Sequence, residues 1–178
     1  MRLFVALCLP DEITASLQLL QSGVPGARWS TTEQMHLTLR FIGEVDGRVA
    51  SSVDDGLSTV RSRWFRLTLK DIGQFGGKTP NTLWVGVEPN AELTHLQRKI
   101  ESVLQRVGLP AETRKYTPHV TLARLKGTTR GRVIEFLTDR ALYKSRPFDV
   151  RGFILYSSRM TPNGSIYRAE KAYQLQPK

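Results

Sequence analysis

The chain has 178 residues, of which 40% are hydrophobic and 24% charged, and these values are typical of a globular rather than a disordered protein. No apolar run approaches the roughly 18 residues that a membrane-spanning helix needs, so we expect no membrane association. Residues 1–90 hold nine basic and nine acidic side chains, whereas residues 91–178 hold seventeen and seven and carry the whole net charge of +10, which favours a phosphate-bearing partner over a merely solvated basic surface.

The first half of the chain mixes predicted strands and helices. Residues 2–9 are apolar and predict a buried strand, in which we expect Cys8 to be a small buried hydrophobic residue. Pro10 and the acidic residues after it end this apolar run, which is then too short for a typical secretion signal. We therefore expect a cytoplasmic protein. The other expected elements are a helix at 11–20, a strand at 36–42, a helix at 47–62, a strand at 65–70, a glycine-rich loop at 71–81 and a strand at 82–87.

The second half has a similar rhythm. We expect a helix at 92–107, a strand at 119–125, a short helix at 131–139, and strands at 148–156 and 166–175 with a turn at 162–164 between them. Because strands and helices mix without regular βαβ alternation, the expected fold class is α+β with antiparallel sheets. No linker-like tract divides the chain, so we expect residues 1–178 to form one domain, and the lack of an apolar heptad predicts a monomer.

One short pattern occurs twice in the chain. Residues His36–Leu39 and His119–Leu122 both read H-x-T-L, and both lie on predicted strands. Since strand side chains alternate between faces, the histidine and the threonine of each motif share one face, with the apolar residues on the other. A lone copy would be weak evidence, but two of the three histidines lie in matching motifs, which indicates two similar lobes that face each other across a cleft.

This pair of motifs suits phosphodiester chemistry. An unperturbed imidazole has a pKa near 6.5, so one of His36 and His119 can act as a general base and the other as a general acid. The hydroxyls of Thr38 and Thr121 can donate hydrogen bonds to phosphate oxygens. No acidic cluster accompanies them, and two histidines make a poor zinc site, so we expect no metal.

The residue five positions after each motif histidine is Phe41 in one lobe and Arg124 in the other. An aromatic ring and a guanidinium plane on opposite walls of a cleft could hold a nucleobase between them. Strict alternation turns Arg124 toward the core, unless the strand ends or bulges near Ala123. Phe41 has core packing as its alternative role, and Arg40 is expected on the face of His36, as a surface arginine within reach of phosphate.

The chain resembles the two-histidine H-x-T phosphoesterase superfamily, specifically the RNA 2′,3′-cyclic phosphodiesterases once called 2′–5′ RNA ligases. The stretches that carry the resemblance are Arg28–Trp29, His36–Gly43, Pro118–Arg124 and Phe153–Ser158. The resemblance implies a bilobal α+β fold with two pseudo-two-fold-related lobes around a central groove, and neither a metal nor an organic cofactor. It also implies hydrolysis of an RNA 2′,3′-cyclic phosphate to a 2′-phosphate.

Roles for individual residues also follow from this resemblance. It implies that His119 is the base that activates water and His36 the acid that protonates O3′, an order that the near-identical motifs do not determine by themselves. Thr38 and Thr121 would hold the phosphate, and Arg124 would contact phosphate or base. Two alternatives remain, namely 2′–5′ RNA ligase activity, which is the reverse chemistry, and a non-catalytic RNA-binding module.

Overall fold

Ten β-strands and four α-helices make up the computed structural model, which describes residues 1–178. Eight strands form two four-stranded antiparallel sheets, in the orders β10-β9-β1-β3 and β2-β7-β6-β5, and the other two form a short ribbon, β4-β8. The expected α+β fold with antiparallel sheets is therefore confirmed. None of the helices is both long and apolar enough to cross a membrane.

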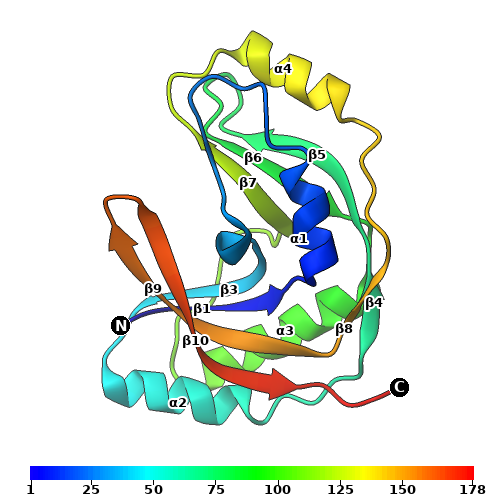
Figure 1. Ribbon diagram of the computed structural model, residues 1–178. Helices are drawn as coiled ribbons and strands as arrows, with labels where there is room; N and C mark the ends of the chain where they lie inside the picture. The colour runs from blue at the N-terminus through cyan, green and yellow to red at the C-terminus, as the bar shows by residue number, and fades with distance from the viewer.

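The first sheet has β1 near its centre, and all residues of β1 from Leu3 to Leu7 are buried. Its strands are β1 (Arg2–Cys8), β3 (His36–Glu44), β9 (Gly152–Thr161) and β10 (Gly164–Gln174). Two helices lie beneath it in Figure 1, α2 (Gly47–Leu57) and α3 (Ala91–Arg106). Asp46 and Asn90 cap these helices by accepting hydrogen bonds from backbone amides of the first turn. The helices thus cover one face of the sheet and leave the face of His36 to the other lobe.

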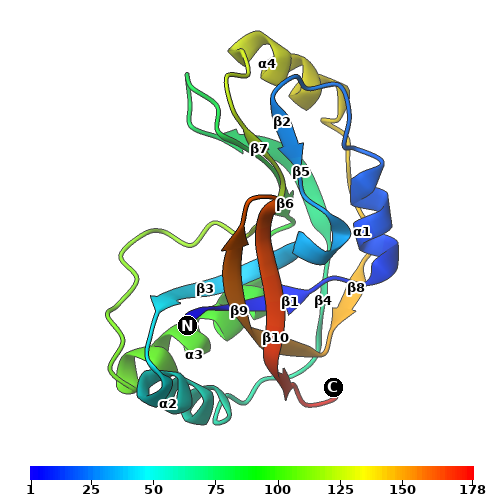
Figure 2. The same cartoon turned by 60° about the vertical axis from the view of Figure 1, so that its left-hand side comes forward.

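The second sheet consists of β2 (Ala27–Trp29), β7 (His119–Leu125), β6 (Thr82–Val87) and β5 (Leu69–Phe75). The remaining elements are α1 (Asp11–Gln18), α4 (Arg130–Asp139), a 3₁₀ turn (Thr32–Gln34), and the ribbon strands β4 (Phe65–Leu67) and β8 (Phe148–Val150). Figure 1 shows α4 above this sheet, and Figure 2 shows α1 at one side of the molecule. One cluster of 34 buried hydrophobic residues includes members of both sheets, so the two lobes share a core.

The expected strand at 65–70 is confirmed except for a break at Thr68, whereas the expected loop at 71–81 is wrong for residues 71–75, which continue as strand. The chain leaves the ribbon at Leu67 and enters the second sheet at Leu69, where β5 runs on through the glycine-rich stretch to Phe75. A Cβ at Gly73 would lie 2.2 Å from Cζ2 of Trp84, so the glycine lets the indole ring lie over β5. The glycine therefore marks close packing within a strand rather than a loop.

Other differences concern the ends of elements. The expected strand at 148–156 is divided into β8 and β9, which belong to different sheets. The short strand β2 was not expected, and α1 and α2 end earlier than their apolar periodicity predicts. Tertiary pairing with β4 and β7 decides the first two cases, and such pairing leaves little trace in the local pattern.

Candidate active site

The two motif histidines stand at the first residues of β3 and β7, in different sheets. Strand β3 contacts β7, and the hydroxyl of Tyr116, just before β7, donates a hydrogen bond of 3.0 Å to the backbone carbonyl of Thr38. The charge of His119 contributes to the lowering of the pKa of His36, so the two rings lie near enough to interact. The fold thus brings together the two motifs, 83 residues apart in the sequence.

Each histidine ring is flanked by an aromatic ring that meets it edge-on. The rings of His36 and Tyr167, from β10, have centroids 5.0 Å apart at 88°. The rings of His119 and Phe75, from β5, have centroids 4.9 Å apart at 86°. These near-equal geometries limit the rotation of both imidazoles, as a pre-organised acid–base pair requires.

A backbone group two residues earlier also lies beside each ring. Nδ1 of His119 lies 2.7 Å from the carbonyl oxygen of Thr117, and the backbone of Gln34 lies near enough to the ring of His36 to oppose the lowering of its pKa. A carbonyl can only accept, so Nδ1 of His119 carries the proton and Nε2 is left for proton transfer. In both motifs, therefore, the backbone two residues before the histidine lies beside its ring.

Both imidazoles are neutral in the unliganded protein at pH 7. Burial, with a further contribution from the charge of His119, lowers the pKa of His36 to about 4. The backbone of Gln34 opposes this change. Burial also lowers the pKa of His119, with a further contribution from the charge of Arg124 and opposition from the hydrogen bond to Thr117. A neutral His119 suits a general base, whereas His36 must gain a proton before it can act as an acid.

The motif threonines lie on the same faces as their histidines. Thr38 and Thr121 are half-buried, and the residues that alternate with them, such as Leu37 and Val120, are fully buried. The hydrogen bond at Thr38 uses its backbone carbonyl, which leaves the hydroxyl free to donate to a ligand. The alternation predicted from the sequence is confirmed for both motifs.

A β-bulge interrupts each motif strand at the fourth residue of the motif. In β3, Thr38 pairs with Ala6 and Arg40 with Val5, so Leu39 is the extra residue. In β7, Leu122 is skipped in the same way. An extra residue reverses the alternation that follows it.

The bulges turn the residues at position +5 back to the histidine faces. Arg124 pairs with Thr82, on the same face as Thr121, and donates a hydrogen bond of 3.4 Å to the Thr82 hydroxyl. Phe41 pairs with Phe4, whose ring contacts His36, and is 52% exposed. The bulge that Arg124 needs is present, one residue before Ala123, and core packing of Phe41 is excluded.

Arg40 is not where the sequence places it. The bulge turns it to the opposite face, where it is only 8% exposed and forms an ion pair of 2.5 Å with Glu101 of α3. Its guanidinium also donates to the carbonyl oxygens of Phe41 and Pro110. Burial would raise the pKa of Glu101, but hydrogen bonds from Arg40, Glu112 and Gln105 lower it below the ordinary value. Arg40 is therefore structural and does not face phosphate.

The expectation for Cys8 is also wrong. It is exposed, lies directly opposite His36 in the β1–β3 pairing, and points its thiol toward the carbonyl oxygen of Leu9, 3.8 Å away. Sequence reasoning missed the neighbours of the histidines as well, because Phe75 was assigned to a loop and Tyr167 lies far away in sequence. The one local signal for a neighbour of the site was Tyr116, which precedes a motif histidine by three residues.

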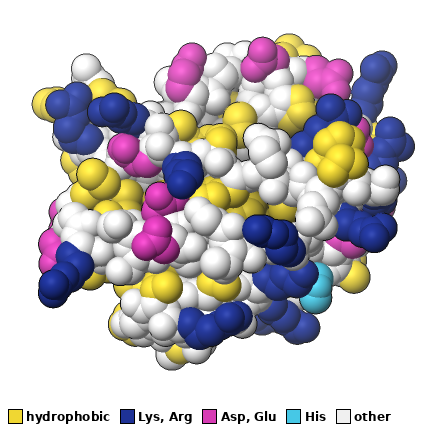
Figure 3. Space-filling view, turned by 90° about the horizontal axis from the view of Figure 1, so that it is seen from below, with side chains coloured by type: hydrophobic (Ala, Val, Ile, Leu, Met, Phe, Trp, Pro, Cys, Tyr) yellow, Lys and Arg dark blue, Asp and Glu magenta, His cyan; other side chains and the backbone are white.

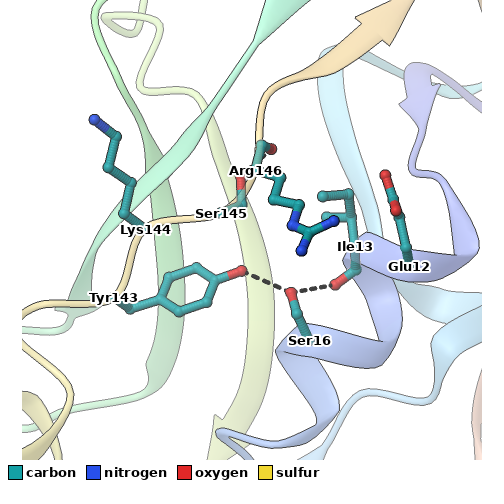
Figure 4. Close-up of a pocket in the computed structure, with 7 residues that line it drawn as sticks. All are labelled: Glu12, Ile13, Ser16, Tyr143, Lys144, Ser145 and Arg146. Carbon is teal, nitrogen blue, oxygen red and sulfur yellow. Dashed lines mark hydrogen bonds between the residues drawn. The ribbon is translucent and has the colours of Figure 1, made fainter.

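Two other surface features are separate from the histidines. A hollow of about 340 Å³ lies between α1 and residues 143–146, where the hydroxyls of Ser16 and Tyr143 are 2.9 Å apart (Figure 4). Neither histidine lines it. On the face seen from below, acidic side chains are scattered over the left and the top, and several Lys and Arg side chains gather at the lower right beside a histidine (Figure 3). No group of three or more His, Cys, Asp or Glu side chains is placed to hold a metal ion.

Comparisons with known proteins agree with this arrangement. A family model described as the 2′-5′ RNA ligase superfamily matches residues 9–160. Two relatives are named RNA 2′,3′-cyclic phosphodiesterase. The one from Aeropyrum pernix is 34% identical, and the match covers 83% of this chain and 85% of the relative. The one from Thermotoga maritima is 33% identical, and the match covers 94% of this chain and 92% of the relative. Structures of E. coli LigT, in apo form and complexed with 3′-AMP, have TM-scores of 0.81 and 0.78 at 26% and 27% identity, covering 98% of this chain and 97% of theirs.

Proposed function

Because the chain belongs to the 2′-5′ RNA ligase superfamily, we propose that it is an RNA 2′,3′-cyclic phosphodiesterase in which His36 and His119 transfer the protons. The observation that carries the proposal is the matched pair of imidazoles from two sheets, each with a backbone group and an edge-on aromatic ring beside it. A protein that only bound RNA would need neither imidazole in such a fixed orientation.

Hydrolysis with these groups balances without a metal ion. His119, neutral at pH 7, accepts a proton from water as the water oxygen forms a bond to phosphorus. The bond from phosphorus to O3′ breaks, and His36 donates its proton to O3′, which leaves a 2′-phosphate and a 3′-hydroxyl. The hydroxyls of Thr38 and Thr121 donate hydrogen bonds to the non-bridging oxygens, where negative charge increases in the transition state.

Because the pKa of His36 is low, the substrate has a second role, which is to favour the protonated form of this imidazole. With a pKa of about 4, this imidazole holds almost no proton at pH 7 in the free protein. An adjacent phosphate anion favours the imidazolium and raises that pKa. The acid is therefore formed only when a phosphate is bound, which limits proton transfer to the loaded site.

Phe41 and Arg124 support recognition of the nucleotide around the reacting phosphate. Both are exposed, and each lies on the face of its motif histidine. An aromatic ring stacks on a base, and a guanidinium contacts either a base or a phosphate. The relative LigT was solved with 3′-AMP, a nucleotide that carries both a base and a phosphate.

One product analysis tests the activity, its regiochemistry and its need for metal. The protein is incubated in EDTA with a 2′,3′-cyclic nucleotide and with RNA ending in a cyclic phosphate, and the expected product is the 2′-phosphate. A 3′-phosphate, or no product, contradicts the proposal. If RNA with a 5′-hydroxyl is supplied at high concentration, 2′–5′ joined RNA would reveal the reverse reaction. RNA binding without turnover would favour a non-catalytic module.

A further inference from the structure

Two arginines stand side by side on the histidine face of the second sheet. Strand β2 pairs with β7, and this pairing places Arg28 directly opposite Arg124. Paired residues of neighbouring strands share a face, so Arg28 lies on the face of His119 and Thr121. Along this face the order is His119, Thr121, Arg124 and then Arg28 on the adjacent strand.

Neither arginine has an anionic partner in the protein. None of the nine ion pairs involves Arg28 or Arg124. Their hydrogen bonds are long and go to neutral oxygens, 3.5 Å from Arg28 to the carbonyl of Pro162 and 3.4 Å from Arg124 to the hydroxyl of Thr82. Like charges directly opposite each other destabilise a strand pair, and a bound anion would remove that cost.

The β9–β10 turn lies close to the Arg28 side chain. A Cβ at Gly164 would lie 3.3 Å from Nη2 of Arg28 and 3.2 Å from Nε2 of Gln34, so the turn approaches both side chains closely. Gln34 donates a hydrogen bond of 3.0 Å to the carbonyl oxygen of Ser165. Figure 2 shows this hairpin reaching from the first sheet toward the second. The turn limits the space open to the guanidinium of Arg28, and such restriction lowers the entropic cost of binding a ligand.

We propose that Arg28 and Arg124 together bind the phosphodiester group on the 5′ side of the cyclised nucleotide. The inference rests on the proposed function: a cyclic phosphate occupies the 3′ end of an RNA, so every further phosphate lies on its 5′ side. A phosphate at the histidines and a second one at the arginine pair would follow the order of side chains along the sheet. The preferred substrate is then an oligonucleotide end rather than a cyclic mononucleotide.

The test compares a cyclic mononucleotide with a dinucleotide that ends in the same cyclic phosphate. Wild-type protein is expected to have the higher kcat/KM on the dinucleotide. Arg28→Gln should lower kcat/KM on the dinucleotide by about 10-fold or more, as for a lost charged hydrogen bond, and much less on the mononucleotide. Arg48→Gln, which removes the same charge from the exposed surface of α2, is the matched control and should change neither. Equal losses on both substrates, or equal effects of both variants, would overturn the inference.

Binding of the 2′-phosphate products separates this inference from the proposed function, because binding needs no turnover. If wild-type protein hydrolyses neither substrate but binds the dinucleotide product more tightly than the mononucleotide product, and Arg28→Gln removes the difference, the phosphate site is supported and the activity is not. If both substrates are hydrolysed and Arg28→Gln leaves the difference in binding intact, the activity stands and the phosphate site is refuted.

Discussion

Arg124 lies on the same face of β7 as His119, five residues earlier, because Leu122 is inserted as a bulge between them. The first motif repeats the relationship, with Leu39 between His36 and Phe41. Regular alternation would send both +5 side chains into the core. The bulge therefore shapes the histidine face in each lobe, since it turns the side chain at position +5 to the same face as the motif histidine.

Phe41 gives the first prediction. Phe41→Ala is expected to raise KM for a cyclic nucleotide about 5- to 100-fold with a smaller effect on kcat, because stacking of a base on an aromatic ring contributes about 1–3 kcal/mol. Phe41→Tyr should retain most of the affinity. Ile134→Ala on α4 is the matched control, since Ile134 is equally exposed at 52%. An unchanged KM in Phe41→Ala would exclude stacking at this position.

The two motif histidines give the second prediction. His36→Ala and His119→Ala should each reduce kcat by about 100- to 10,000-fold, the range for loss of a general acid or base. His95→Ala, which alters the exposed third histidine on α3, should keep full activity. Circular dichroism and thermal unfolding would show that all three variants fold. Substantial turnover by either motif variant would contradict the acid–base roles.

The protonation of His36 can be followed directly. Its pKa in the free protein is about 4, and we expect a bound 2′-nucleotide to raise it by about 2, because an opposite charge within a few ångströms favours the imidazolium. NMR titration of the imidazole carbon-bound protons, assigned with His36→Gln, measures the change. A pKa that stays near 4 in the complex would mean that His36 is not the acid at neutral pH.

Arg40 is expected to matter for stability and not for chemistry. Arg40→Ala leaves the half-buried Glu101 without its ion-pair partner and should lower the free energy of unfolding by about 1–3 kcal/mol. Because the folded pKa of Glu101 is lowered, its contribution is present above an ordinary pKa of 4.5 and is lost as the pH falls below it. Denaturant titrations at pH 7 and pH 4 should therefore show a smaller difference between Arg40→Ala and wild type at pH 4.

The same variant also tests the assignment of Arg40 to the interior. The folded fraction of Arg40→Ala should keep kcat/KM within a few-fold of wild type, when activity is assayed well below its thermal midpoint. If Arg40→Ala had a normal free energy of unfolding but a large loss of activity, Arg40 would contact the substrate and would not be a structural residue.

Salt should affect substrates according to their length. Positive charge is concentrated in residues 91–178, and each phosphate contact releases counterions, so KM should rise with salt more steeply for a long RNA than for a cyclic mononucleotide. The slope of log KM against log salt for each substrate measures the difference. Equal slopes would exclude the basic half of the chain as an RNA-binding surface.

The sequence predicts the chemistry of this site better than it predicts the strands that form it. The two H-x-T-L motifs are local patterns, and a period of two places each histidine beside its threonine whatever the strand pairs with. By contrast, the extent of β5 depends on the contact of Gly73 with Trp84, and β8 and β9 separate because they pair with different partners. Such contacts join residues that are distant in sequence, so no local window contains them.

By itself, the sequence determined the family, the α+β class and the four motif residues, because these depend on residue identity and on alternation within a few residues. The tertiary structure decided which later residues reach the site. The register against β1 and β6 inserts Leu39 and Leu122, which turns Phe41 and Arg124 outward and Arg40 inward. The physical reason is that a bulge is defined by the hydrogen-bonded partner strand, and a single extra residue reverses the face of every side chain that follows it.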